Sequence, residues 1–285
     1  MEKGLSFLTC AHVTAATSKM RAKFASELRS KLKVRQRVAT TRLYCERMSL
    51  ALFGKRRRKA CGRLLCYHSV GQPEFGVNDA SPERFRRQIE FALEKGYRFV
   101  PAAKIARGEG EARDLGITFD DGWRSVLTTA APILSEYKIP WTLFVATGFL
   151  DDQSDWHRSH VLRWKDIDDL LNMGAEIGSH SVSHPDFARI DEQRVVDELE
   201  HSKAAIASRF GLLVDCFAIP FGQSNNWTPF AQQAALRAGY KLIYAQAENT
   251  RPAGTIPRTF VTSIDSDWIF NALLEGAFDN WEEWY

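Results

Sequence analysis

From residue 62 onward, short apolar runs alternate with longer amphipathic segments, and this alternation restricts the possible folds more than any other feature. The runs have the length of strands, whereas the segments between them repeat apolar residues at the helical spacing. The expected strands are residues 62–68, 115–119, 141–146, 175–178, 216–219, 242–245 and 256–261. The expected helices are residues 81–96, 124–137, 165–173, 192–210, 228–238 and 268–276. Strands and helices that take turns indicate an α/β protein with a parallel sheet, either open or closed into a barrel.

Charge is divided unevenly along the chain. Residues 1–60 contain 16 Lys and Arg against 3 Asp and Glu, which leaves 22 and 32 of the totals of 38 and 35 for the remainder. So sharp a change of sign marks a boundary, which we place at residues 59–62. We therefore expect a basic N-terminal extension, residues 1–60, helical or partly disordered, followed by a folded domain, residues 61–285. A chain of 285 residues with 45% apolar residues can bury a sizeable core.

The basic extension has three interpretations. Phe24, Leu28 and Leu32 lie four residues apart, so a basic amphipathic helix within residues 19–59 could lie on an anionic membrane. A solvated or partly disordered tail is the simplest alternative. Nucleic-acid binding, which the basic run 55–59 supports, is the least favoured of the three.

Cysteine usage and hydropathy bear on the location of the protein. The five cysteines are an odd number without Cys-x-x-Cys spacing, which favours reduced thiols in a cytoplasm-like compartment. Residues 5–16 resemble the apolar part of a signal peptide only faintly, because polar residues interrupt them, and secretion is not expected. The chain contains no run of about eighteen apolar residues, so no transmembrane helix is expected. We expect a cytoplasmic protein, with or without peripheral membrane contact.

One expected strand, residues 115–119, ends on two adjacent carboxylates and a glycine, Asp120-Asp121-Gly122. Neighbouring acids repel each other, and burial raises the pKa of a carboxyl, so a folded protein keeps such a pair most easily beside a positive charge. A metal ion is the simplest candidate. A solvated Asp-Asp-Gly turn is the alternative, since these residues commonly form turns.

A second strand end carries two histidines four residues apart, His180 and His184. Neutral imidazoles suit zinc and other first-row divalent metals, and two imidazoles with one carboxylate leave coordination positions open for water and substrate. The alternative is a pair of surface histidines.

Three stretches in order, residues 118–122, 180–184 and 220–222, resemble the first three motifs of the polysaccharide deacetylase family, the NodB-like carbohydrate esterases. Within this family, the chain resembles the branch of the poly-N-acetylglucosamine deacetylases. The resemblance runs from about residue 63 to about residue 276 and implies that residues 61–285 are a catalytic domain. It also implies a distorted (β/α)7 barrel, whose active site would lie at the carboxyl ends of the strands.

The resemblance assigns roles to the motif residues. It makes Asp120 the general base and Asp121, His180 and His184 the ligands of one divalent metal ion. Zinc is the default metal, and cobalt, nickel or manganese would also suit these ligands. The remaining candidates, for substrate binding, are Pro220, Phe221, Gly222 and Trp164. The resemblance makes the backbone N–H of Phe221 a donor to the oxyanion.

Two departures from the family pattern affect the site. The usual third motif begins with an Arg that pairs with the base, whereas this chain has Phe217-Ala218-Ile219 before Pro220. Arg258 is the candidate to replace that charge, and an ordinary surface Arg is the alternative. No histidine follows His201 to act as the usual general acid. The resemblance to the poly-N-acetylglucosamine branch transfers that role to His68, which otherwise would be a buried histidine at a strand end.

The predicted function is a metal-dependent hydrolase that removes N-acetyl groups from amino sugars of a poly- or oligosaccharide or glycan precursor. The expected partner is therefore a carbohydrate. Two alternatives stay open: a metal-dependent hydrolase of a non-sugar amide, and a non-catalytic glycan-binding protein on the same scaffold.

Overall fold

The computed structural model describes residues 38–152, 154–246 and 252–281. The chain divides into two compact units, residues 1–48 and 49–285. The described part of the first unit, residues 38–48, is helical, and the apolar positions Phe24, Leu28 and Leu32 and residues 5–16 lie outside the described residues. In the described ranges, no helix is both long and apolar enough to cross a membrane.

The basic run 55–59 belongs to the second unit, although charge alone placed the boundary at residues 59–62. Arg57 N donates to Glu275 O at 2.8 Å, and the side chain of Arg56 forms an ion pair with Glu275 at 2.9 Å. Charge pattern marks where the basic residues stop, whereas these contacts decide which segment packs with the domain.

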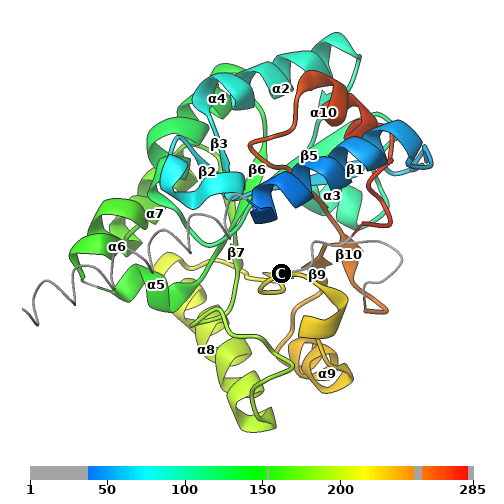
Figure 1. Ribbon diagram of the computed structural model, residues 1–285. Coiled ribbons are helices and arrows are strands. Elements are labelled where there is room, and N and C mark those ends of the chain that lie inside the picture. Colours follow the sequence, from blue (N-terminus) through cyan, green and yellow to red (C-terminus); the bar gives the residue numbers. More distant parts are fainter. Residues whose placement is uncertain (1–37, 153, 247–251, 282–285) are drawn as a thin grey trace, which may run out of the picture. The chain divides into compact units, whose positions relative to one another are not determined.

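A parallel sheet of nine strands forms the centre of the second unit. Figure 1 shows helices on the outside of this sheet. Its strands pair in the order β10-β9-β8-β7-β6-β5-β1-β11, and β4 pairs with β5. The six strands that correspond to the predicted runs are β1 (Arg63–Tyr67), β5 (Asp114–Phe119), β6 (Trp141–Val145), β7 (Ala175–Ser179), β8 (Cys216–Ala218) and β9 (Leu242–Ala245). Three short strands complete this sheet: β4 (Arg98–Phe99), β10 (Ile256–Pro257) and β11 (Thr259–Phe260). Two others, β2 (Ser69–Val70) and β3 (Asp79–Ala80), pair with each other in a separate two-stranded sheet.

The two ends of this sheet meet at one residue. Strand β10 pairs with β9 at one end and β11 pairs with β1 at the other, and only Arg258 separates β10 from β11 in the sequence. The predicted strand 256–261 is therefore interrupted, because Arg258 N turns to the carbonyls of Ala245 and Gln246, at 3.0 and 2.9 Å. Counted as one position, β10 and β11 complete a distorted seven-position barrel, which confirms the predicted fold class.

Helices surround the sheet, and most begin at a side-chain cap. In five of the nine helices α2 to α10 the capping side chain accepts a hydrogen bond from a backbone N–H in the first turn. These caps are Ser81, Ser154, Asp191, Thr228 and Ser266. The α-helices are α2 (Pro82–Glu94), α3 (Ala102–Ala106), α4 (Ala131–Glu136), α5 (Thr147–Asp151), α6 (Asp155–His160), α7 (Trp164–Asn172), α8 (Glu192–Phe210), α9 (Pro229–Arg237) and α10 (Asp267–Leu274). A π-helical turn (Val126–Ala130) leads into α4. A 3-10 segment kinked at Gly76 spans Pro73–Asn78, and a single 3-10 turn spans Ser224–Asn226.

The core includes an apolar cluster to which helix α3 and strands β1, β6, β8 and β9 contribute. Helix α3 packs on β1 and β5 there, and Gly116 allows the approach, since a Cβ at that position would lie 2.7 Å from Leu64 Cδ2 and 3.0 Å from Ala102 Cα. The buried members of the cluster are Leu64, Ala102, Ile105, Phe144, Ala218, Leu242 and Tyr244.

Candidate active site

A cavity of about 280 Å³ opens where β1, β5, β7, β8 and β9 end. Each of these strands is followed by a loop that carries one or more of the residues facing the cavity. The lining residues are Cys66, His68, Asn78, Asp120, Asp121, His180, His184, Phe221, Gln246 and Arg258. In parallel barrels this end of the strands is where active sites form.

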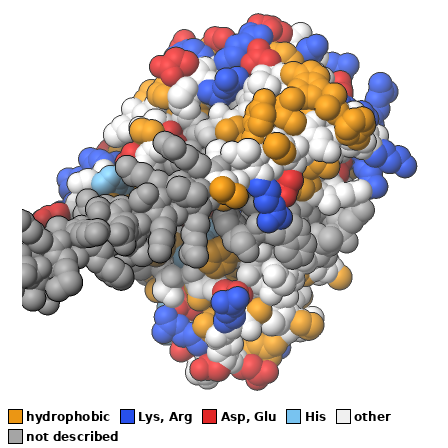
Figure 2. Space-filling view, viewed as in Figure 1, with side chains coloured by type: hydrophobic (Ala, Val, Ile, Leu, Met, Phe, Trp, Pro, Cys, Tyr) orange, Lys and Arg blue, Asp and Glu red, His pale blue; other side chains and the backbone are white. Residues whose placement is uncertain are grey.

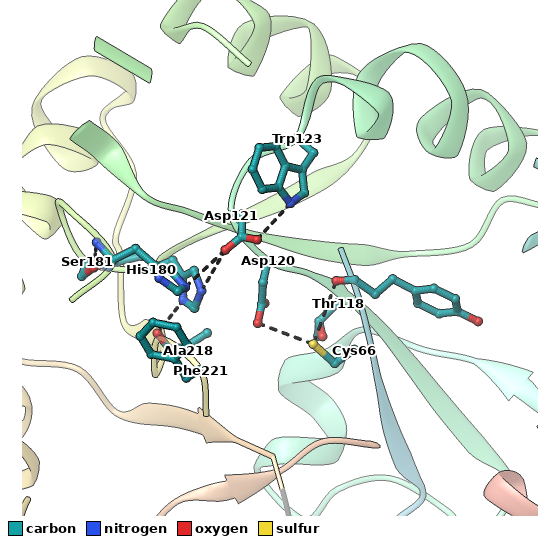
Figure 3. A network of polar contacts seen from close by, with 12 residues as sticks. Cys66, Thr118, Asp120, Asp121, Trp123, His180, Ser181, Ala218 and Phe221 are labelled. Atoms are coloured by element: carbon teal, nitrogen blue, oxygen red, sulfur yellow. Dashed lines mark hydrogen bonds and ion pairs between the residues drawn. The ribbon is translucent and has the colours of Figure 1, made fainter. Parts of the chain in front are cut away.

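Asp121, His180 and His184 lie together, as the sequence predicts, with ligand atoms within 4.8 Å of one another. Asp121 Oδ1 is 3.4 Å from His180 Nε2 and 3.4 Å from His184 Nε2 (Figure 3). Donor atoms of a tetrahedral zinc site with bonds of about 2.0–2.1 Å lie about 3.3 Å apart. These three side chains therefore fit a divalent metal ion.

Hydrogen bonds outside the triad orient its donor atoms. His180 Nδ1 lies 2.8 Å from Ala218 O, an acceptor, so Nδ1 carries a proton and Nε2 faces Asp121. Trp123 Nε1 donates to Asp121 Oδ2 at 2.9 Å, which leaves Oδ1 directed at the two imidazoles (Figure 3). Metal sites in proteins commonly use such outer hydrogen bonds to hold ligands in place.

The backbone at the site adopts an uncommon conformation. Among the described residues, five that are not glycine have positive φ, and four of them are Asp121 (71°), Ser181 (70°), His184 (56°) and Phe221 (64°). Side chains with a Cβ rarely occupy this region, so surrounding contacts must hold the backbone there. One such contact is the bond from His184 N to Ser181 Oγ, at 2.9 Å.

Burial and neighbouring charges shift the pKa values of the three triad residues in different directions. Burial and the neighbouring charge of His180 lower the pKa of His184 to about 4. Burial alone would lower the pKa of His180, but the charge of Asp120 and the hydrogen bond to Asp121 outweigh burial and raise that pKa above its ordinary 6.5. Burial opposes ionisation of Asp121 as well, yet the hydrogen bond from His180 and the charge of His184 hold its pKa well below 3.8. The carboxylate of Asp121 is thus ionised, as a metal ligand has to be.

The predicted base, Asp120, pairs with Arg258 in a buried bidentate contact. Arg258 Nη1 donates to Asp120 Oδ1 at 2.6 Å, and Nη2 donates to Oδ2 at 2.7 Å. Burial would raise the pKa of Asp120, but the charges of Arg258 and His180 and the hydrogen bonds from Arg258 together outweigh burial and hold this pKa below 3.8. Arg258 occupies the place the sequence predicts for it, and the ring faces of Phe144 and Tyr244 lie 5.3 and 5.9 Å from its guanidinium carbon.

Cys66 and His68 complete the cavity on the β1 side. Cys66 Sγ lies 3.5 Å from Asp120 Oδ2, and burial raises the pKa of the thiol well above its usual value despite the opposing charge of Arg258. His68 packs edge-on against Phe260, at 5.1 Å between ring centres, and its Nδ1 has no hydrogen-bond partner in the described part of the chain. Cys66, His68 and Asp120 also cluster, but the Asp121 triad is the better metal site, because Asp120 is engaged by Arg258 and the thiol holds its proton.

The predicted substrate-binding residues occupy different places. Phe221 lines the cavity, with its ring centre 4.7 Å from that of His184, while Pro220 and Gly222 are buried in the turn beside it. Gly222 is required there, since its φ is 70° and a Cβ would come within 2.8 Å of Gln246 Cγ. Trp164 does not line the cavity; its indole donates to Asp151 and lies 4.4 Å from the guanidinium carbon of Arg209.

Glu198, on α8, is a residue that the sequence reasoning missed. Its Oε2 accepts hydrogen bonds from Val182 N and Ser183 N, each at 2.8 Å, and its Oε1 accepts from Ser183 Oγ at 2.6 Å. Glu198 thereby holds the segment between the two ligand histidines. The signal was available, because Glu198 lies on the buried face of an amphipathic helix, three residues after Val195, where an unpaired acid is not expected.

The geometry defines a parallel barrel protein with a metal-binding triad and a buried acid–arginine pair at the carboxyl ends of its strands. Residues 107–243 match the family model described as "Polysaccharide deacetylase". Together with the three motifs in order, this match identifies residues 107–243, just under half of the chain, as a polysaccharide deacetylase domain.

Individual relatives are distant. Over 215 residues the chain is 24% identical to a poly-beta-1,6-N-acetyl-D-glucosamine N-deacetylase of Staphylococcus aureus (strain MSSA476). The aligned region covers 70% of this chain and 73% of that protein. Among solved structures, the deacetylase PplD of Streptococcus pyogenes is 22% identical with a TM-score of 0.65, covering 78% of this chain and 98% of that one. IcaB from Ammonifex degensii is 23% identical with a TM-score of 0.63, covering 78% and 99%.

Proposed function

We propose that the protein is a metal-dependent hydrolase that removes N-acetyl groups from amino sugars of a poly- or oligosaccharide. One observation carries the proposal: the Asp121–His180–His184 triad and the buried Asp120–Arg258 pair face the same cavity. Amide hydrolysis needs an activated water, a base for its proton, and an acid for the leaving amine. The cavity offers a residue for each of these tasks.

The bound metal would polarise the amide carbonyl and acidify a water molecule. Asp120 accepts the proton of the attacking water, and Arg258 keeps Asp120 ionised and fixed in direction through its two hydrogen bonds. As the carbon–nitrogen bond breaks, His68 protonates the amine, so the products are acetate and the free amino sugar. By family resemblance, the backbone N–H of Phe221 donates to the developing oxyanion.

For the metal we propose zinc, on the basis of two imidazoles and one carboxylate, with cobalt, nickel and manganese as alternatives. Elemental analysis of the purified protein, with His180→Ala and His184→Ala alongside, tests this assignment. One metal per chain in the wild type and loss in both variants would support it. A protein that holds no metal and cannot be loaded would overturn the metal site.

The relative from Staphylococcus aureus is named for poly-beta-1,6-N-acetyl-D-glucosamine, so polymers of N-acetylglucosamine are the substrate class that we propose. The test is amine release from N-acetylglucosamine oligomers by the metal-loaded protein and by its Asp120→Asn variant, with acylated amines that contain no sugar in the same panel. We expect release from the oligomers by the wild type only, with metal retained in the variant. Release only from the non-sugar amides would favour the other hydrolase class, and metal binding without any turnover would favour a glycan-binding protein.

We also propose that the basic segment makes peripheral contact with anionic membranes. In its described part, Leu52 and Phe53 are 58% and 82% exposed and precede the basic run 55–59. Figure 2 shows hydrophobic side chains next to those of Lys and Arg on the face in view. Such a combination favours the surface of an anionic bilayer. Co-sedimentation with phosphatidylserine vesicles tests it, and equal binding by Phe53→Ser would contradict it. A cytoplasmic location is likewise proposed, on the cysteine pattern.

A further inference from the structure

Four aromatic rings next to the metal triad form a surface that the catalytic residues do not use. We call this surface the aromatic shelf; it consists of Phe75, Trp123, Trp156 and His160. It begins at the triad, because the indole of Trp123 is the group that donates to Asp121 (Figure 3). The ring of Phe75 lies 4.0 Å from that of Trp123, and the ring of Trp156 lies 6.1 Å from it, measured between centres. The shelf therefore starts at a metal ligand and leads away from it.

The outer part of the shelf is held in place. The ring of His160 stacks on that of Trp156, at 4.7 Å and 19°. His160 Nδ1 lies 2.8 Å from Trp156 O, and His160 Nε2 lies 3.1 Å from Glu74 Oε1, so both ring nitrogens have partners that fix the ring plane. The loop after β5 is tied to the residues that follow α6 by the bond from Leu162 N to Gly122 O, at 2.9 Å. Three separate segments thus hold the rings together.

Trp156 is exposed despite these contacts. Its exposed fraction is 48%, although it packs against Phe75, Trp123 and His160. A large aromatic ring that is both fixed and exposed has the properties of a binding surface, since it offers apolar area at little cost in conformational entropy. Carboxylates of Glu74 and Asp152 lie around it, each in contact with a histidine of α6. An apolar face with polar groups at its edge complements a pyranose ring, which has an apolar C–H face and hydroxyl groups around its rim.

We propose that the aromatic shelf binds a second sugar residue of the chain whose neighbouring residue is being deacetylated. This inference rests on the proposed function, because it takes the occupant of the metal site to be an N-acetyl amino sugar. The protein would then act on oligomers in preference to the single sugar. The proposal names Trp156 as the main contact, since it is the most exposed ring of the four.

The experiment compares Trp156→Ala with Trp268→Ala, which removes a similarly exposed tryptophan, 43% exposed, on α10. The measured quantity is the ratio of kcat/KM for an N-acetylglucosamine tetramer to that for N-acetylglucosamine. We expect the ratio to fall about threefold to tenfold in Trp156→Ala and to stay unchanged in Trp268→Ala. Trp156→Phe, which keeps a ring, should recover most of the ratio. Equal ratios in wild type and Trp156→Ala would overturn the proposal.

Two additions keep the result interpretable. Trp156→Leu keeps apolar volume without a ring. If this ratio of kcat/KM falls in Trp156→Leu and is recovered in Trp156→Phe, the loss is due to the aromatic face, even where Trp156→Ala does not fold. Tetramer binding is measured by calorimetry in the metal-loaded Asp120→Asn protein, with and without Trp156→Leu. If neither the wild type nor any variant releases amine from any sugar, but tetramer binding depends on the ring of Trp156, the proposed hydrolase function is refuted and the aromatic shelf as a sugar-binding surface is supported. Binding that does not depend on the ring refutes the shelf alone.

Discussion

Replacement of Glu198 should weaken metal binding although this residue touches no metal ligand. Glu198→Ala removes the acceptor of two backbone N–H groups, Val182 and Ser183, and of one hydroxyl. A buried donor without a partner costs about 1–3 kcal/mol. Because Ser183 is exposed, the loop can shift and let water satisfy part of this loss. We expect the free energy of unfolding of the metal-free protein to fall by about 1–3 kcal/mol.

The effect on the metal follows from the position of this loop. It carries His184, whose φ of 56° must be held by its surroundings, so a relaxed loop would displace one ligand of three. Removal of groups that orient metal ligands commonly costs about 10- to 100-fold in affinity. The assay is a competition titration with a chromophoric chelator, in parallel with urea unfolding of the metal-free protein.

Two variants on α8 serve as controls. Glu198→Gln keeps a carbonyl oxygen for the two backbone N–H groups. It places an amide nitrogen opposite the Ser183 hydroxyl and Arg194, both at exposed positions where water can replace the lost contacts. We expect it to bind metal within about threefold of the wild type, since the backbone bonds persist. Glu200→Gln, at an exposed position, should have no effect. A metal affinity of Glu198→Ala within twofold of the wild type would refute the positioning role.

Three further predictions concern other contacts. Arg258→Met removes a charge that opposes the rise in the pKa of Asp120 caused by burial, so the pKa of this base should rise. Because the base acts when ionised, the acid limb of the pH profile of kcat/KM should move to higher pH by about one unit or more. Trp123→Phe removes the hydrogen bond to a metal ligand and should weaken metal binding about tenfold, measured by the same titration. Asp279→Ala leaves the buried guanidinium of Arg63 without its carboxylate and should lower the free energy of unfolding by about 3–5 kcal/mol, measured with urea; a loss under about 1 kcal/mol would contradict this.

Elements with strong local signals were predicted well. Helix α8 spans Glu192–Phe210 and strand β9 spans Leu242–Ala245, as expected, because periodicity, an Asp cap and flanking glycine all act within a few residues. Helices α3, α5 and α6 were not predicted. Each has only five or six residues, too few to show a period, and their formation depends on packing against the barrel.

The sequence by itself determined the kinds of chemistry that the chain can support. A carboxylate pair at one strand end and two histidines at another are local features, and parallel strands bring their carboxyl ends to one side of a barrel. This is why the positions of Asp120, Asp121, His180 and His184 along the chain suffice to predict that they share one site.

Only the tertiary structure decided which groups complete that site. Arg258 is 138 residues from Asp120 in sequence, and it reaches the carboxylate because β10 and β11 close the barrel beside β1. The pairing of Glu198 with the histidine loop and the assembly of the aromatic shelf are equally long-range. Sequence patterns report local conformation and burial, whereas such contacts depend on which strands become neighbours and how the chain folds back over them.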